Sequence, residues 1–377
     1  MTRLNERALH EAAAQKTQLS DFGTPDYLPG LRQIIAAASE RPASSKLDAL
    51  IENRVLHSLV GRLHSQHGWQ QHPAYRQSPI VAPIIITGMS RSGTSALHQL
   101  LAADEQFQWI PHWIAERPTV RPLQQNWLSS SAYRVSDAEL ADDRQNTPEM
   151  RKAHNVEAAL PEECINVMCQ SFISMMFITT MPLPRYREWF FRQDETGSYQ
   201  RYADNLRLIG LEDGGERAWL LKNPSHTGAM QALLRVFPDA RIIVTHRDPV
   251  AAVSSAVSLT NIVSGDLWEP GEAARTRLEV GLHNVTRLQA ARELNPDNFH
   301  DVDYRQFVAD PMGVVRGIYS NFGLTLGPTA EARMRTWIAD NPQGKFGQHQ
   351  YQTDAMGIDA DEIRRRFADY IRRYRLN

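Results

Sequence analysis

The most informative segment of this chain is Pro83-Ile-Ile-Ile-Thr-Gly-Met-Ser-Arg-Ser-Gly-Thr-Ser95. Three isoleucines run into a loop bounded by Gly88 and Gly93, and a helical pattern follows from Ala96 to Ala103. A strand, a glycine-bearing turn and a helix N-terminus in this order are typical of a loop that binds phosphate through backbone N–H groups. The sequence therefore predicts an anion site at this turn, and a purely structural turn is the alternative.

The side chains of the loop indicate which kind of nucleotide it would hold. Ser92, Gly93, Thr94 and Ser95 are expected to present backbone N–H groups and hydroxyls to an anion, assisted by the helix dipole. The lysine of nucleotide triphosphatase loops is absent, because Thr94 stands in its place and Arg91 is the cation of the loop. This pattern favours a nucleotide donor that is cleaved differently from ATP.

Further strands are expected at residues 218–221, 241–245 and 299–303, and a helical pattern follows each of them. Repeated strand–helix units favour right-handed crossovers on a parallel sheet. The sequence therefore predicts an α/β, P-loop-type three-layer fold with a central parallel sheet flanked by helices. We expect residues 1–78 to form an N-terminal helical extension packed on one domain at 79–377.

An insertion bordering the acceptor site is expected around residues 112–215, and its part at 118–161 is polar and irregular. Residues 164–184 are rich in Ile, Met and Phe. They indicate a buried helix rather than a membrane span, because polar groups such as Asn166 would be costly in lipid. Residues 361–374 predict an amphipathic helix that packs by its apolar face.

Composition limits the partners. The 377 residues carry a net charge of −2, which gives no general attraction to nucleic acid or anionic membranes. Two cysteines cannot support a disulfide framework, and the N-terminus lacks the apolar core of a signal peptide. We expect a cytoplasmic protein without stable membrane insertion and without a nucleic-acid partner, and a homodimer is left open.

A second anion site is predicted in Arg241-Ile-Ile-Val-Thr-His-Arg-Asp-Pro-Val-Ala-Ala-Val-Ser-Ser255. Asp248 is a good N-cap and Pro249 a good first helical residue, so Arg247 falls at the carboxyl end of the strand, where open α/β sheets bind ligands. Arg247 and Ser255 could hold a second phosphate through charge-assisted hydrogen bonds. A helix-packing or ion-pair role for Arg247 is the alternative.

Together, the phosphate loop and this second motif resemble the sulfotransferases that use 3′-phosphoadenosine 5′-phosphosulfate (PAPS). The resemblance covers most of residues 83–351 and is closest to the bacterial branch related to tyrosylprotein sulfotransferases. It implies that PAPS is the co-substrate and that the loop holds its 5′-phosphosulfate. In this branch an arginine at the position of Arg91 replaces the loop lysine, and no metal is expected.

The resemblance also implies roles in nucleotide binding for later residues. Arg247 and Ser255 match the 3′-phosphate site of the family. Tyr304 matches a tyrosine that packs on the adenine, and a core tyrosine is the alternative. Lys345 and Gly347 lie in a stretch that resembles the loop covering the nucleotide in this family.

Catalytic candidates lie in Trp219-Leu-Leu-Lys-Asn-Pro-Ser-His226. Lys222 matches the family lysine that stabilises charge on the departing phosphate and on the transferring sulfuryl group, and a solvated lysine is the alternative. His226 falls near the histidine base of the cytosolic sulfotransferases and has a suitable intrinsic pKa. At a helix start it could instead orient the loop.

Two other candidates for the base are acidic. In tyrosylprotein sulfotransferases the base is a glutamate soon after the phosphate loop, and the nearest match here is Glu116. Related bacterial sequences often carry the acid directly after the tryptophan, where this chain has Ile114. A third candidate is His154 with Glu162 or Glu163. As candidates for the base, the sequence ranks His226 first, Glu116 second and Glu163 third.

The sequence predicts the acceptor pocket less well than the nucleotide site. Six side chains could form an adaptable apolar surface, although core packing explains them more simply: Met168, Phe172, Met175, Met176, Phe177 and Met181. If some of them line the site, a small apolar or lipid-like acceptor is favoured. The predicted activity is sulfuryl transfer from PAPS to a hydroxyl or amine of such a molecule. The alternatives are a P-loop small-molecule kinase and an inactive nucleotide-binding scaffold.

Overall fold

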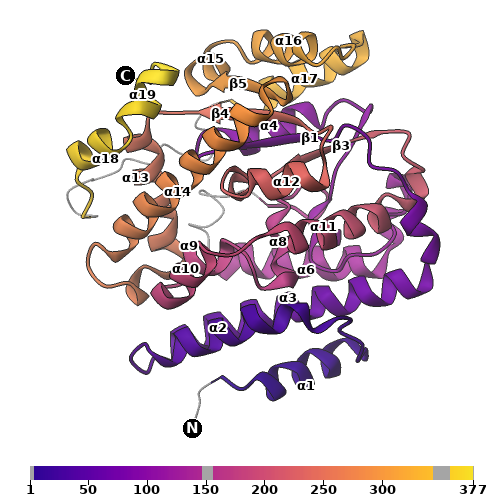
Figure 1. Cartoon of the computed structure of the whole chain (residues 1–377). Coiled ribbons are helices and arrows are strands. Elements are labelled where there is room, and N and C mark those ends of the chain that lie inside the picture. The colour runs from indigo at the N-terminus through magenta and orange to yellow at the C-terminus, as the bar shows by residue number, and fades with distance from the viewer. Residues whose placement is uncertain (1–3, 147–155, 343–356, 377) are drawn as a thin grey trace.

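A computed structural model describes residues 4–146, 156–342 and 357–376 of the chain. Five parallel strands form the central sheet in the order β2-β3-β1-β4-β5 (Figure 1). Their bounds are β1 Ile84–Gly88, β2 Phe107–Gln108, β3 Ala218–Lys222, β4 Arg241–His246 and β5 Phe299–Asp303. The predicted fold class and its four strands are confirmed. The edge strand β2 was not expected, since two residues are too few to produce a recognisable pattern.

Helices cover both faces of the sheet, because successive side chains of a strand point to opposite faces. Ile84 and Ile86 pack against α4 (Thr94–Leu101), α15 (Tyr304–Ala309), α16 (Pro311–Asn321) and α17 (Pro328–Asp340). Ile85 lies in the cluster on the other face, with α5 (His112–Ala115), α11 (Thr196–Ile209), α12 (Met230–Val236) and α14 (Glu272–Leu294). These are the three layers that the strand–helix pattern predicted.

A further apolar cluster joins α13 (Pro249–Ser264) and α14 to α18 (Ala360–Arg366) and α19 (Ala368–Tyr374). The predicted C-terminal helix is therefore two short helices that meet at Phe367, with the apolar face buried as expected. Within the described residues, one segment is long and apolar enough to cross a membrane, Pro249–Leu267. Half of that segment is buried, which is usual for a core helix.

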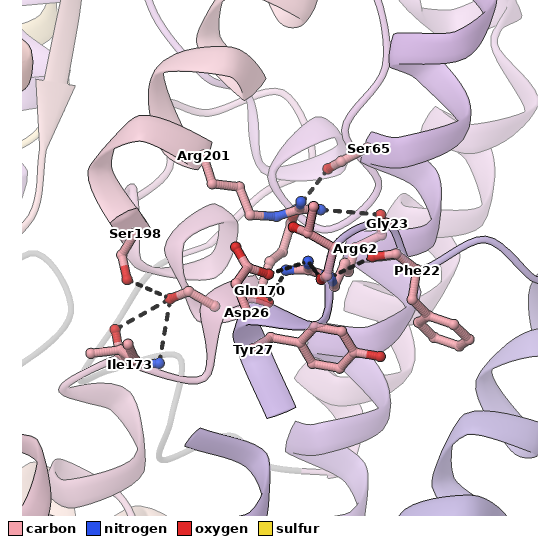
Figure 2. A network of polar contacts seen from close by, with 12 residues as sticks. Phe22, Gly23, Asp26, Tyr27, Arg62, Ser65, Gln170, Ile173, Ser198 and Arg201 are labelled. Carbon is pink, nitrogen blue, oxygen red and sulfur yellow. Dashed lines mark hydrogen bonds and ion pairs between the residues drawn. The ribbon is translucent and has the colours of Figure 1, made fainter. Parts of the chain in front are cut away.

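The N-terminal extension consists of α1 (Glu6–Thr17), α2 (Leu28–Ser39) and α3 (Ser45–Gln71). These helices pack on the segment at 169–191 (Figure 1). The fully buried side chain of Arg62 fastens the contact (Figure 2). It donates to the carbonyls of Phe22 (2.7 Å), Thr24 (2.6 Å) and Gln170 (3.2 Å) and pairs with Asp26. One side chain thus satisfies backbone groups on both sides of the interface.

Replacing Arg62 with Met is expected to lower the free energy of unfolding by about 3 kcal/mol, because three carbonyls lose their donor in a buried position. Urea unfolding followed by circular dichroism measures the change. The matched control is Arg7→Met, since Arg7 makes an exposed pair with Glu11, and this substitution should leave the stability nearly unchanged. Equal effects of the two substitutions would contradict the fastening role.

Two predictions within the insertion are wrong. Residues 164–184 form short helices rather than one long helix: α8 (Ile165–Met168) and α9 (Met176–Thr179), with α10 (Pro184–Phe190) beginning at the end of the segment. The break falls at Phe172, whose φ of 54° cannot continue an α-helix, and the Ser171 hydroxyl bonds to nearby backbone instead. The segment at 118–161, predicted to be irregular, contains α6 (Ser131–Asn146), whose polar sequence hides the helical period.

The apolar side chains of the same insertion are part of the core, as their simpler interpretation predicted. Met168, Phe172, Met175, Phe177 and Met181 are all buried, and most pack against the N-terminal helices. Short 3₁₀ turns complete the chain at Pro25–Tyr27, Pro73–Gln77, Gln124–Ser129, Cys169–Ser171, Leu211–Asp213, Pro224–Thr227, Gly265–Leu267 and Pro296–Asn298.

Candidate active site

The loop between β1 and α4 can form only with glycine at both ends. Gly88 has a φ of 139°, and a Cβ there would lie 2.3 Å from the carbonyl oxygen of Thr245 on β4. Gly93 has a φ of 88°, and its Cβ would lie 2.9 Å from the ring of Tyr304. Each position requires positive φ and leaves no room for a side chain. The loop is thereby held against β4 and against the start of α15.

Ser92 stabilises the loop from inside. Its N–H and its hydroxyl both donate to the carbonyl of Met89, at 3.2 and 2.6 Å, and the hydroxyl also lies 2.5 Å from that of Thr245. Both donors of Ser92 are thus engaged within the protein, and its contact with an anion stays a prediction. Thr94 and Ser95 open α4, which has no side-chain N-cap, so its first N–H groups suit an anion.

The two predicted phosphate motifs form one cationic site at the carboxyl ends of β1 and β4. Arg91 Nε donates to the Ser255 hydroxyl at 3.0 Å. Arg247 Nη1 donates to the carbonyl of Arg91 at 2.7 Å, and its guanidinium lies 4.5 Å from the centre of the Tyr304 ring. The sequence assigned these four residues to the loop cation, the second anion site and the adenine contact. The structure brings all four together. Asp248 fixes this arrangement by capping α13 through the N–H groups of its first turn.

Lys222 lies at the end of β3 with 2% of its surface exposed. Its ammonium donates to the Ser95 hydroxyl at 3.0 Å and pairs with Glu163 Oε1 at 2.5 Å. The lysine therefore stands beside the first turn of α4, next to the predicted phosphate loop. Glu163 is the carboxylate in direct contact with it.

A series of contacts between acidic residues and histidines continues from Glu163. The N–H of Glu163 donates to Glu162 Oε1 at 2.6 Å, and Glu162 Oε2 lies 2.5 Å from His112 Nδ1. His112 Nε2 is 3.7 Å from Glu116 Oε1, which lies 3.0 Å from His57 Nε2. This series of contacts thus runs from the predicted phosphate loop to the N-terminal extension.

In this series of contacts, His112 and Glu116 have shifted pKa values. Burial opposes the charged imidazole of His112, but the hydrogen bond and charge of Glu162 hold its pKa above the ordinary value. Burial likewise opposes ionisation of Glu116, yet the hydrogen bond and charge of His57, together with the charges of His112 and Arg117, lower its pKa to about 2. Glu116 is therefore an ionised carboxylate that pairs with these neighbours.

His226 lies in the core. Its side chain is fully buried, its Nδ1 lies 2.6 Å from the Tyr199 hydroxyl, and Tyr202 packs on the ring. Burial lowers the pKa of His226 to about 3. Its Nε2 has no hydrogen-bond partner among the described residues. The neighbouring Thr227 has the closer link to the loop, since its hydroxyl accepts from the N–H of Gly88 at 3.1 Å.

Three residues named from the sequence, His154, Lys345 and Gly347, lie outside the described residues. Within the described parts of the chain, no group of three or more His, Cys, Asp or Glu side chains could hold a metal ion. His112 and Thr227 were not named from the sequence. The signal for His112 was its place four residues before Glu116.

Comparison with known proteins gives consistent results. A family model described as the sulfotransferase family matches residues 83–328. The omega-hydroxy-beta-dihydromenaquinone-9 sulfotransferase Stf3 of Mycobacterium tuberculosis is 24% identical over 327 residues, which cover 81% of this chain and 80% of that protein.

Two crystal structures resemble almost the whole molecule. Sulfotransferase STF1 from Mycobacterium tuberculosis H37Rv gives a TM-score of 0.89 at 34% identity, covering 98% of this chain and 99% of the other. Sulfotransferase STF9 from Mycobacterium avium gives 0.87 at 27% identity, covering 100% and 98%. These coverages include the N-terminal helices, which are therefore part of the shared fold.

Proposed function

This protein belongs to the sulfotransferase family, and we propose that it transfers the sulfuryl group of PAPS to the hydroxyl of a small apolar alcohol. The observation that carries the proposal is the single cationic site formed by Arg91, Arg247, Ser255 and Tyr304 over the phosphate loop. A nucleotide with phosphate groups at two positions of its ribose suits a site with two arginines and one aromatic ring.

The donor would be held by its two charged ends. The N–H groups at the start of α4 and the Ser95 hydroxyl suit the 5′-phosphosulfate, because helix N-termini favour anions. Arg247 and Ser255 suit the 3′-phosphate. The ring of Tyr304 already supports the Arg247 guanidinium and borders Gly93, so it can also contact the adenine.

In the transfer step the acceptor oxygen attacks sulfur, and the bond between sulfur and the bridging phosphate oxygen breaks. The electron pair of that bond stays on the bridging oxygen, so the 5′-phosphate of the departing adenosine 3′,5′-bisphosphate carries one more negative charge than it did in PAPS. Lys222 is placed to neutralise this charge, because its ammonium lies beside Ser95 in a nearly dry position. The proton of the acceptor hydroxyl goes to a base.

We assign that base to Glu163, which differs from the order that the sequence favoured. Its carboxylate lies 2.5 Å from Lys222 Nζ, so a hydroxyl placed at the lysine is also within its reach. His226 has a pKa of about 3 and is enclosed by Tyr199 and Tyr202, which makes it a weak and inaccessible base. Glu116 is ionised, but its described contacts are with His57, His112 and Arg117 rather than with Lys222.

An apolar acceptor is supported by the relatives. Stf3 is named for a menaquinone derivative with an omega-hydroxyl, and this chain is similar to it over most of both lengths. An alcohol with an apolar body carries the reacting group that the transfer step needs.

Calorimetry with adenosine 3′,5′-bisphosphate, 5′-AMP and ATP with Mg²⁺ tests the donor. The bisphosphate is expected to bind at least about tenfold more tightly than 5′-AMP, because only the former carries a 3′-phosphate for Arg247. Transfer of radiolabelled sulfate from PAPS to farnesol completes the test. Tight binding of ATP with Mg²⁺ and none of the bisphosphate would indicate a kinase instead. Bisphosphate binding without transfer to any alcohol of a broad panel would indicate an inactive scaffold.

A further inference from the structure

A short antiparallel pairing leads the chain to the proposed base. Pro111, shortly after the carboxyl end of β2, forms an isolated antiparallel bridge with Pro161. Next to this bridge, the N–H of Glu162 donates to the carbonyl of Ile110 at 2.8 Å. The pairing therefore fixes the backbone as far as Glu162, and Glu163 is the first residue beyond it.

The backbone around Glu163 is held by contacts on both sides. The N–H of Glu163 donates to Glu162 Oε1 at 2.6 Å, and the N–H of Cys164 donates to the carbonyl of Lys222 at 3.0 Å. The carboxylate of Glu163 then meets the ammonium of the same lysine. These two backbone contacts therefore determine where the carboxylate of Glu163 lies relative to Lys222.

Glu162 is in turn held by His112. Both residues are buried, each with 7% of its surface exposed, and His112 Nδ1 lies 2.5 Å from Glu162 Oε2. Burial opposes a charge on His112, but the hydrogen bond and charge of Glu162 hold its pKa above the ordinary value. One carboxylate oxygen thus faces the imidazole and the other accepts from the N–H of Glu163. An ionised carboxylate can accept from two donors at once, whereas an amide has a single acceptor oxygen.

We propose that the His112–Glu162 pair positions the base of the transfer step. By holding the backbone N–H of Glu163, the pair keeps the carboxylate of Glu163 beside Lys222 and within reach of the acceptor hydroxyl. His112 and Glu162 are positioning residues in this proposal, and Glu163 is the catalytic one. A displacement of a reacting group by about 1 Å can cost about 100-fold in rate. The inference rests on the proposed sulfuryl transfer with Glu163 as its base.

A double-mutant cycle between Glu162 and Glu163 tests the proposal. The value of kcat is measured by transfer of radiolabelled sulfate from PAPS to the best acceptor in a panel of neutral alcohols. Glu162→Leu is expected to lower kcat about 100-fold in the wild type. In the Glu163→Gln background the same substitution should lower kcat by less than about threefold further, because its effect passes through the carboxylate of Glu163. The Kd of adenosine 3′,5′-bisphosphate, from calorimetry, should change by less than about threefold throughout.

Asp104→Leu is the matched control, because Asp104 is also a buried carboxylate that accepts from a backbone N–H. It accepts from the N–H of Gln106 at 3.0 Å and from the Tyr319 hydroxyl at 2.7 Å. These contacts lie before the amino end of β2, away from the carboxyl ends of the strands where open α/β sheets bind ligands. The control should therefore keep kcat within about threefold of the wild type.

Glu162→Gln tests whether the two acceptor oxygens matter. The amide keeps one acceptor oxygen for two donors, so its kcat should fall between those of the wild type and Glu162→Leu. If Glu162→Leu fails to bind the bisphosphate, Glu162→Gln replaces it in the same cycle.

The outcomes separate this inference from the proposed function. Transfer to no alcohol of the panel would contradict the proposed function, and an unchanged kcat in Glu163→Gln would contradict the assigned base. With Glu163→Gln impaired as expected, two results would each overturn the positioning role alone. One is a kcat of the Glu162 variants equal to that of the wild type, and the other is an equal loss of kcat in both backgrounds.

Discussion

Glu163→Gln lowers kcat by about 10²–10⁴-fold if Glu163 is the base that takes the acceptor proton. The amide keeps the size and an oxygen that can still accept from Lys222, but it cannot hold the proton. Because the contact of Lys222 with the Ser95 hydroxyl does not depend on Glu163, the Kd of adenosine 3′,5′-bisphosphate should change by less than about threefold. Radiolabelled sulfate transfer to farnesol gives kcat, and calorimetry gives the Kd.

Two substitutions serve as controls, since both residues were candidates for the same role. His226→Gln should leave kcat within about tenfold of the wild type, because the ring lies in the core against Tyr199. Glu116→Gln should also leave kcat within about tenfold of the wild type, because the described contacts of Glu116 are with His57, His112 and Arg117 rather than with Lys222. A loss of kcat confined to His226→Gln, in a variant that still binds the bisphosphate, would restore the histidine as the base.

The local motifs explain why the cluster of arginines at the carboxyl ends of β1 and β4 could be predicted from the sequence. The glycines of the loop, the Asp248 cap and the arginine at the strand end act over a few residues, and each fixes a backbone geometry. Parallel strands then bring their carboxyl ends to one edge. Arg91 and Arg247 therefore meet although 156 positions separate them.

The catalytic side of the site depends on contacts that no local pattern specifies. Glu163 meets Lys222 across 59 positions, and Glu162 meets His112 across 50. His226 follows Lys222 by only four residues, yet the 3₁₀ turn at Pro224–Thr227 directs its ring into the core. Closeness in sequence therefore did not predict which of these side chains contacts Lys222. The irregular path of residues 164–184 was equally hidden, since it depends on the conformation of Phe172.

Arg247→Ala is expected to weaken binding of adenosine 3′,5′-bisphosphate by about 2–5 kcal/mol, or roughly 30- to 5000-fold in Kd. The substitution removes the cation proposed for the 3′-phosphate. It also removes the donor to the carbonyl of Arg91, which helps to hold the loop. The Kd of 5′-AMP separates these effects, because a loss through the 3′-phosphate alone leaves it unchanged, whereas a disordered loop weakens both ligands. The matched control is Arg335→Ala on α17, an exposed arginine paired with Glu331, which should alter neither constant.

Arg247→Lys sharpens the same experiment. Lysine keeps the positive charge but lacks the planar fork that can hold the Arg91 carbonyl and a phosphate oxygen together. An intermediate Kd for the bisphosphate is therefore expected, between those of the wild type and Arg247→Ala. If both variants bind the bisphosphate as tightly as the wild type does, Arg247 serves only to brace the loop on the Tyr304 ring. The donor would then have to be held without a 3′-phosphate site at the end of β4, which is incompatible with the proposed mode of binding.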